Sequence, residues 1–67
     1  MNIEASVWIE NNYEWLVQKF NNKWLGASSD GFVVAGESFD LALEETLRRE
    51  VNLSDIVFIY LTTEIIQ

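Results

Sequence analysis

The spacing of the apolar residues changes twice along this 67-residue chain, and that change constrains the fold more than any single motif. Residues 3–9 alternate between apolar and polar side chains, which is the pattern of a strand with one buried face. Residues 13–20 are rich in aromatic and branched side chains and predict a second strand. Asn-Asn pairs follow both segments, at 11–12 and 21–22, and Asn tolerates the backbone conformations of tight turns. We therefore expect two consecutive hairpins, with residues 23–27 as a third strand.

A helical pattern follows a loop at 28–31 and a further extended segment at 32–35. Ser38 is typical of a helix N-cap, and Asp40 would lie at the positive end of the helix dipole. Apolar residues recur at helical spacing from Phe39 to Val51, while Glu and Arg occupy the other side as i,i+4 pairs. Asn52 is the expected stop, and residues 56–66 return to a strand pattern. The fold class predicted is α+β, with an antiparallel three- to four-stranded sheet and one helix on one face, in the order β-β-β-α-β. Residues 1–67 would form a single domain.

The hairpin register predicts where the aromatic residues lie. If both Asn-Asn turns are two-residue loops, Trp8 pairs with Trp15, and Lys19 pairs with Trp24. The opposite face would be aliphatic and covered by the helix, whereas the tryptophan face would be open and suited to a protein interface. A longer loop would shift this register, and the last strand or the 28–35 segment could instead cover part of the face. The predicted partner interface comprises Trp8, Tyr13, Trp15, Val17 and Trp24, with Leu41 on the flank of the helix.

The residue types that are missing exclude most catalytic chemistry. The chain has no Cys and no His, so it lacks thiolates, disulfides and the commonest metal ligand and general base. Its serines have no histidine to activate them, and neighbouring helix carboxylates such as Glu44 and Glu45 diverge rather than converge on a substrate. A Mg²⁺ or Ca²⁺ site at Asp30 and Glu37 would need more ligands than that loop offers. We expect a non-enzymatic protein with no catalytic residues, no cofactor and no metal.

The charge balance limits the possible partners. Eleven Asp and Glu against four Lys and Arg give a net charge of −7, which disfavours nucleic acid and anionic membranes. The acid excess serves solubility, or it attracts a small basic protein. No apolar run approaches the roughly 20 residues that span a bilayer, and the N-terminus does not read as a signal segment. We expect a cytoplasmic protein. A chain of this size has a thin core, which also favours a homodimer.

Residues 31–47 read GFVVAGESFDLALEETL and resemble part of the HicB-type antitoxin domain. In that family a short strand leads through a Gly-Asp/Glu-Thr/Ser corner into a helix, and the upstream hairpin at 5–20 is similar to the family's first two strands. Leu41 departs from the pattern because the family usually has Glu there, and the family's proline-and-cysteine segment has no counterpart here. Residues 53–67 are too short for the DNA-binding module of full-length HicB antitoxins. The matching positions are Gly36, Glu37, Ser38, Phe39, Ala42 and Leu43.

The resemblance implies a stand-alone domain that binds and neutralises a protein, classically by capping a small basic ribonuclease toxin, without DNA binding of its own. Two other hypotheses remain open. One is an acidic phage-type inhibitor whose carboxylates mimic nucleic-acid phosphates. The other is a self-assembling structural domain in which the tryptophan face forms a dimer interface.

Overall fold

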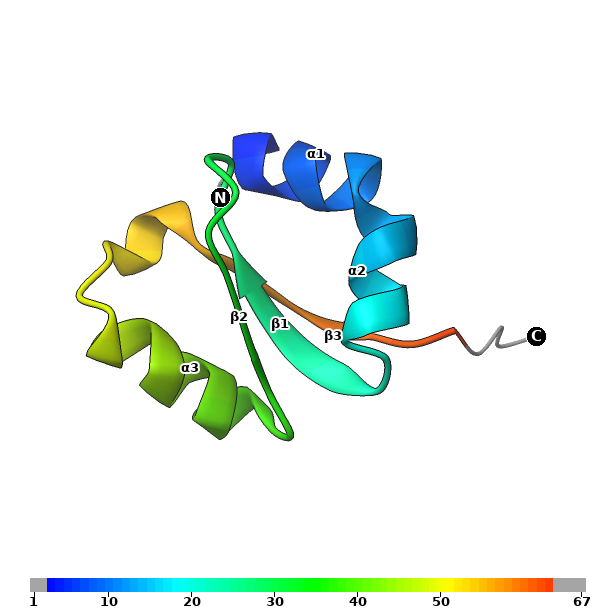
Figure 1. Ribbon diagram of the computed structural model, residues 1–67. Helices are drawn as coiled ribbons and strands as arrows, with labels where there is room; N and C mark the ends of the chain where they lie inside the picture. The colour runs from blue at the N-terminus through cyan, green and yellow to red at the C-terminus, as the bar shows by residue number, and fades with distance from the viewer. Residues whose placement is uncertain (1–2, 64–67) are drawn as a thin grey trace.

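The computed structural model describes residues 3–63, in which three helices surround a three-stranded antiparallel sheet (Figure 1). The fold is therefore α+β, as predicted. In chain order the elements are α1 (Ile3–Asn11), α2 (Tyr13–Lys19), β1 (Lys23–Ala27), β2 (Val33–Gly36), α3 (Phe39–Arg48), the 3-10 helix η1 (Leu53–Asp55) and β3 (Val57–Leu61). Residues 64–66 of the predicted last strand lie outside the described part of the chain.

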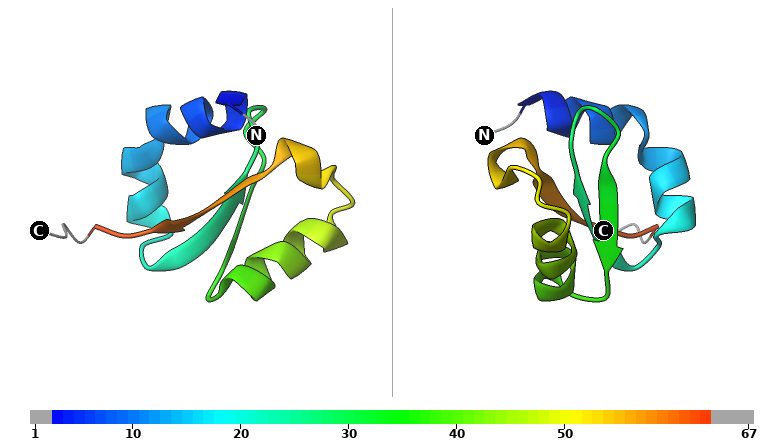
Figure 2. Two further views of the ribbon diagram at one scale, coloured as in Figure 1. Left: turned by 180° about the vertical axis from the view of Figure 1, so that it is seen from behind. Right: turned by 60° about the vertical axis from the view of Figure 1, so that its left-hand side comes forward.

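The sheet has the order β2-β1-β3, with the central β1 antiparallel to both neighbours. Trp24 of β1 lies between Gly36 and Tyr60, whereas Leu25 lies between Ala35 and Ile59 and faces the other way. The two views of Figure 2 show α1 and α2 on one side of the sheet and α3 on the other. The sheet thus carries helices on both faces, where one helix on one face was expected.

The prediction of strands at 3–9 and 13–20 is wrong, because these residues form α1 and α2. The buried residues of α1 are Ala5 and Ile9, which are four apart and so share one side of a helix. Ile3 and Val7, which completed the alternating pattern, remain exposed. Asn12 joins the two helices: its side-chain amide donates to the Trp8 carbonyl at 2.8 Å, which satisfies an acceptor near the end of α1. The first Asn-Asn pair therefore forms a helix-helix corner rather than a hairpin turn.

The main core lies between the α1–α2 pair and the sheet. Its buried members come from both helices and from two strands: Ile9, Leu16, Val17, Leu25, Ala27 and Leu61. Partly buried Trp8, Tyr13 and Phe20 pack against this group from the helix side. Helices can cover this face because every second residue of β1 and β3 points toward them.

The helix at 39–48 confirms the prediction for this segment. The Ser38 hydroxyl accepts a hydrogen bond from the Leu41 amide at 3.2 Å, as expected for an N-cap. Arg48 forms ion pairs with Glu44 at 3.4 Å and with Glu45 at 3.1 Å. The helix ends at Arg48, earlier than the predicted stop at Asn52. Asn52 instead caps η1, where its side chain accepts from the Ser54 amide.

Candidate interaction surfaces

The predicted tryptophan face does not form, although two of its three tryptophans remain neighbours. The rings of Trp8 and Trp15 meet edge to face, with centroids 6.3 Å apart, at the α1–α2 corner. Trp15 is 43% exposed, and its indole N–H donates to the Asn12 side-chain oxygen at 2.9 Å. Trp24 lies on the opposite side of the sheet, because the α1–α2 segment contributes no strand to pair with β1.

Two other predicted interface residues point inward. Val17 is only 7% exposed and belongs to the main core, so its prediction as a partner contact is wrong. Tyr13 is partly buried against the same core, and its hydroxyl donates to the Thr62 carbonyl at 3.4 Å. Both side chains point inward because residues 13 and 17 are four apart in a helix and so share the side of α2 that packs on the sheet.

A second aromatic group, which the sequence reasoning missed, occupies the face of the sheet that carries α3. Centroid distances within it are 5.5 Å for Trp24–Phe39, 5.8 Å for Trp24–Tyr60 and 5.2 Å for Phe39–Phe58. We call these four residues the aromatic cluster. The Phe58 ring fills the space above Gly26, because an added Cβ there would lie 2.8 Å from the ring edge. Phe58 and Tyr60 are two apart in the predicted strand at 56–66 and so share one face of it, but the wrong hairpin register gave no contact of either residue with Trp24.

The aromatic cluster is only partly covered. Helix α3 packs on β2 and β1 and reaches β3 chiefly through the contact of Phe39 with Phe58. Phe39 and Tyr60 are 40% and 44% exposed, and Leu47 on the adjoining side of α3 is exposed as well. The β3 half of this face is therefore an apolar surface open to a partner.

Leu41, the remaining predicted contact, lies in a groove on the other flank of α3. The groove has a volume of ≈ 570 Å³ and runs between the end of α2, β2 and α3. Lys19, Lys23 and Arg48 line it, opposed by three glutamates, and Lys23 pairs with Glu37 at 2.5 Å. Most of the basic residues of the chain thus gather here beside compensating acids, which leaves a locally neutral surface.

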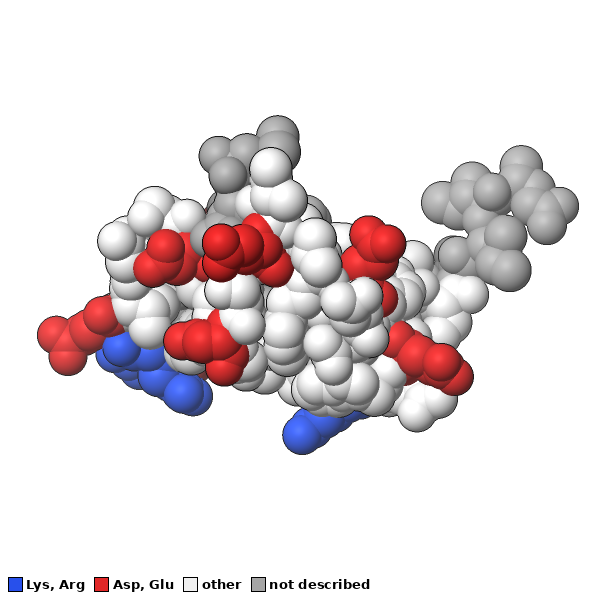
Figure 3. Space-filling view, turned by 90° about the horizontal axis from the view of Figure 1, so that it is seen from above, with Lys and Arg blue, Asp and Glu red and all other residues white. Residues whose placement is uncertain are grey.

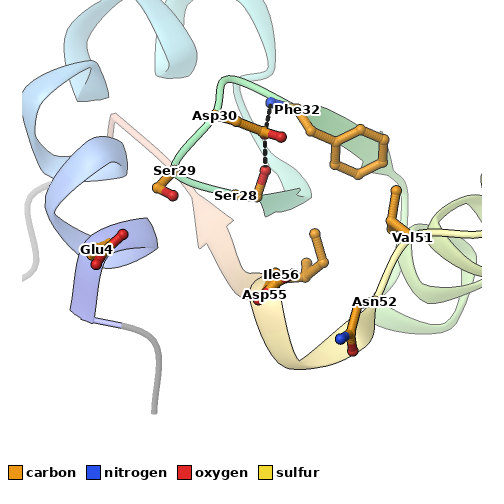
Figure 4. A pocket seen from close by; sticks show the side chains of 9 residues that line it. All are labelled: Glu4, Ser28, Ser29, Asp30, Phe32, Val51, Asn52, Asp55 and Ile56. Carbon is orange, nitrogen blue, oxygen red and sulfur yellow. Dashed lines mark hydrogen bonds between the residues drawn. The ribbon is translucent and has the colours of Figure 1, made fainter.

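A smaller polar pocket lies between α1, the β1–β2 loop and η1 (Figure 4). Asp30 accepts hydrogen bonds from the Ser28 hydroxyl and, at 3.1 Å, from the Phe32 amide. The hydrogen bond from Ser28, followed by the one from Phe32, lowers the pKa of the Asp30 carboxyl below its ordinary value. These bonds lie within the loop, so the role of Asp30 is to close the turn between the two strands. Within residues 3–63 no group of three potential ligand side chains could hold a metal ion.

The carboxylates gather on the side of the molecule that carries α1. Figure 3 looks onto this side and shows acidic side chains spread across it, with Lys and Arg emerging only at its margin. Helix α1 contains no Lys or Arg, and α2 contains one lysine, in its last turn. We call the following exposed carboxylates the acidic face: Glu4 and Glu10 on α1, Glu14 on α2, and Asp30 and Asp55, which line the polar pocket together with Glu4.

Comparison of the chain with protein-family models, with curated proteins and with solved structures gives no significant match. Across residues 3–63, none of the helices has the length and apolar character needed to cross a bilayer. Fold and surface together define a small α+β domain with a sheet between two helical layers, an acidic face on one side and an open apolar surface on the other.

Proposed function

We propose that this chain is a non-enzymatic, cytoplasmic protein-interaction domain that binds and neutralises a small basic protein through its acidic face. The observation that carries the proposal is the composition of the exposed side of α1 and α2. Five carboxylates are exposed there, on the β1–β2 loop and on η1, and the apolar side chains of Ile3, Val7 and Trp15 are exposed on the same two helices.

This combination of side chains suits a protein partner better than a small molecule. Protein interfaces combine apolar anchors, tryptophan above all, with a polar rim that keeps water out. Trp15 is held by the Asn12 hydrogen bond and by the Trp8 ring, so little side-chain freedom would be lost on binding. The carboxylates around it would steer a basic partner and exclude acidic ones.

The resemblance to HicB-type antitoxins supports this proposal through one segment. Residues 33–48 form strand β2, a corner at Gly36, an N-cap at Ser38 and helix α3, in that order. The motif that resembles the HicB-type family has the same order of strand, corner and helix. Residues 5–20 lie in helices, so they add nothing to the resemblance. The role as an antitoxin therefore rests on the charge and apolar content of the acidic face together with that one motif.

Co-expression with the product of a neighbouring reading frame that encodes a small basic protein tests the proposal. We expect a complex that survives purification at low salt and weakens as salt screens the charges. A triple variant of the acidic face, Glu4→Gln, Glu10→Gln and Glu14→Gln, should lower the affinity at least about tenfold.

The matched control carries the same change in net charge on and just after α3: Asp40→Asn, Glu44→Gln and Glu50→Gln. It should bind nearly as well as the unaltered chain. Equal weakening by the two triple variants would mean that net charge, and not the acidic face, drives binding. Absence of any complex with such a protein would refute the proposed function. Competition of the partner with DNA or RNA would instead favour mimicry of phosphates.

A further inference from the structure

Strand β3 presents an unprotected sheet edge. It pairs with β1 on one side, and no strand from residues 3–63 pairs with it on the other. In the rear view of Figure 2, β3 runs in front of β1 and no helix covers it. An edge strand turns a row of backbone N–H and C=O groups toward solvent, and these groups can pair with a further strand.

The sequence of this edge lacks the usual protection against pairing. Natural proteins place Lys, Pro or inward-pointing charges on exposed edge strands, or they shorten and bulge the strand. Residues 56–63 read IVFIYLTT and contain no charged residue and no proline. The opposite edge of the sheet differs, because the groove beside β2 is lined by Lys19, Lys23 and Glu37.

Apolar surface continues from this edge onto the adjoining face. Tyr60 projects from β3 into the aromatic cluster, and Phe39, which is exposed, contacts the cluster from α3. Leu47, two turns further along α3, is exposed as well. Pairing of a short strand buries little area by itself, and a stable interface needs more than about 1,000 Å² with good packing. The half-open aromatic cluster offers additional area next to the strand.

The charge distribution favours a second copy as the occupant. Two chains of net charge −7 repel one another over most of their surface. An approach through β3 brings the uncharged segment 56–63 of each copy into contact, and not the acidic faces, which belong to α1, α2 and the segments beside them. A basic partner would gain no ion pair from this strand.

We propose that two copies of the chain pair through β3 about a two-fold axis to form a continuous six-stranded sheet. Two-fold pairing of identical strands is antiparallel and self-complementary. If the axis passes through the middle residue of the strand, Ile59 lies opposite Ile59 of the partner subunit. Tyr60 then lies opposite Phe58 of the partner subunit, which joins the two aromatic clusters across the interface. This proposal does not depend on the basic partner.

Sedimentation equilibrium of the purified chain at 1–100 μM tests the interface. The unaltered chain should be dimeric at the upper end of this range. Tyr60→Lys places a charge on the open face without altering a buried residue, and it should shift the chain to monomer. Trp15→Lys is the matched control, because Trp15 is an equally exposed aromatic residue on the opposite side of the sheet, and its dimer should persist. Circular dichroism checks that both variants are folded.

Cross-linking is a second measurement of the β3 interface, and it tests the proposal even if Tyr60→Lys fails to fold. The chain has no native cysteine, so Ile59→Cys creates a single thiol at the proposed two-fold axis, on the side of β3 that packs against the main core. Mild oxidation should convert it to a covalent dimer much faster than Trp15→Cys. A monomer at 100 μM would overturn the proposal. So would a dimer that Trp15→Lys dissociates.

Discussion

Replacing Gly36 with alanine is expected to lower the free energy of unfolding by about 1–2 kcal/mol, because α3 packs directly on this glycine. A Cβ at Gly36 would lie 2.7 Å from the Ala42 backbone nitrogen and 3.0 Å from the Leu41 Cβ. Helix backbone does not rotate aside as the end of a side chain does, so α3 must move away from β2. Such overpacking costs about 1–3 kcal/mol. Alanine recovers about 0.4–1 kcal/mol of this, because it restricts the unfolded chain and Gly36 has no positive φ.

Thermal unfolding followed by circular dichroism at equal protein concentrations would measure this loss. At this chain length about 1 kcal/mol corresponds to about 4–8 °C, so Tm should fall by roughly 4–16 °C. Gly26→Ala is the matched control: its Cβ would lie 2.8 Å from the edge of the Phe58 ring and 3.1 Å from a methyl group of Val34. Both neighbours are side chains and not backbone, and the Phe58 ring belongs to the half-open aromatic cluster and can turn away. It should therefore cost less. A Gly36→Ala protein as stable as the unaltered chain, or a larger loss for Gly26→Ala, would refute the reasoning.

Three further substitutions test the core, the helix cap and the loop. Leu25→Ala removes a fully buried side chain and should lower the free energy of unfolding, measured in urea, by about 2–5 kcal/mol. Leu41 is exposed, so Leu41→Ala should lower it by less than about 0.5 kcal/mol. Similar losses for the two variants would place Leu25 outside the core. Ser38→Ala removes the N-cap acceptor and should cost about 1 kcal/mol, and a neutral result would contradict the cap. The folded pKa of Asp30 is depressed, so its contribution to stability is complete above the ordinary value of 3.8 and disappears as pH falls through the folded pKa. Asp30→Asn should therefore flatten the fall of Tm as the pH drops below the ordinary pKa of 3.8, and an unchanged slope would exclude this role.

The chain from β1 to β3 could be predicted because local signals there agree with the long-range packing. Ser38 caps α3, and the i,i+4 pair of Glu44 with Arg48 forms on its outer side. The bounds of β1 and β2 lie within one residue of the prediction, and β3 begins one residue after its predicted start but ends at Leu61, whereas the prediction ran to residue 66. Each of these signals acts over a few residues and depends little on what the rest of the chain does.

Residues 3–20 could not be predicted because their pattern fits two periods equally well. Ala5 and Ile9 satisfy both an alternating pattern and an i,i+4 pattern, and the β-branched residues tip the local preference toward strand. Packing decides between the two: as helices, α1 and α2 satisfy their own backbone groups and still bury Ile9 and Leu16 on the sheet. The helical conformation of residues 3–20 also determines which residues are exposed for binding, because it separates Trp24 from Trp15 and buries Val17 in the core.

The two proposed surfaces are compatible because they lie on different parts of the sheet. Dimerisation through β3 would use one edge and the half-open aromatic cluster, whereas the acidic face belongs to α1, α2 and the neighbouring loops on the other side. A two-fold axis perpendicular to the sheet keeps both α1–α2 pairs on the same side of the six-stranded sheet. The dimer would then present two acidic faces side by side, so that a basic partner carrying two binding patches, or itself dimeric, would bind with higher avidity than either face provides alone.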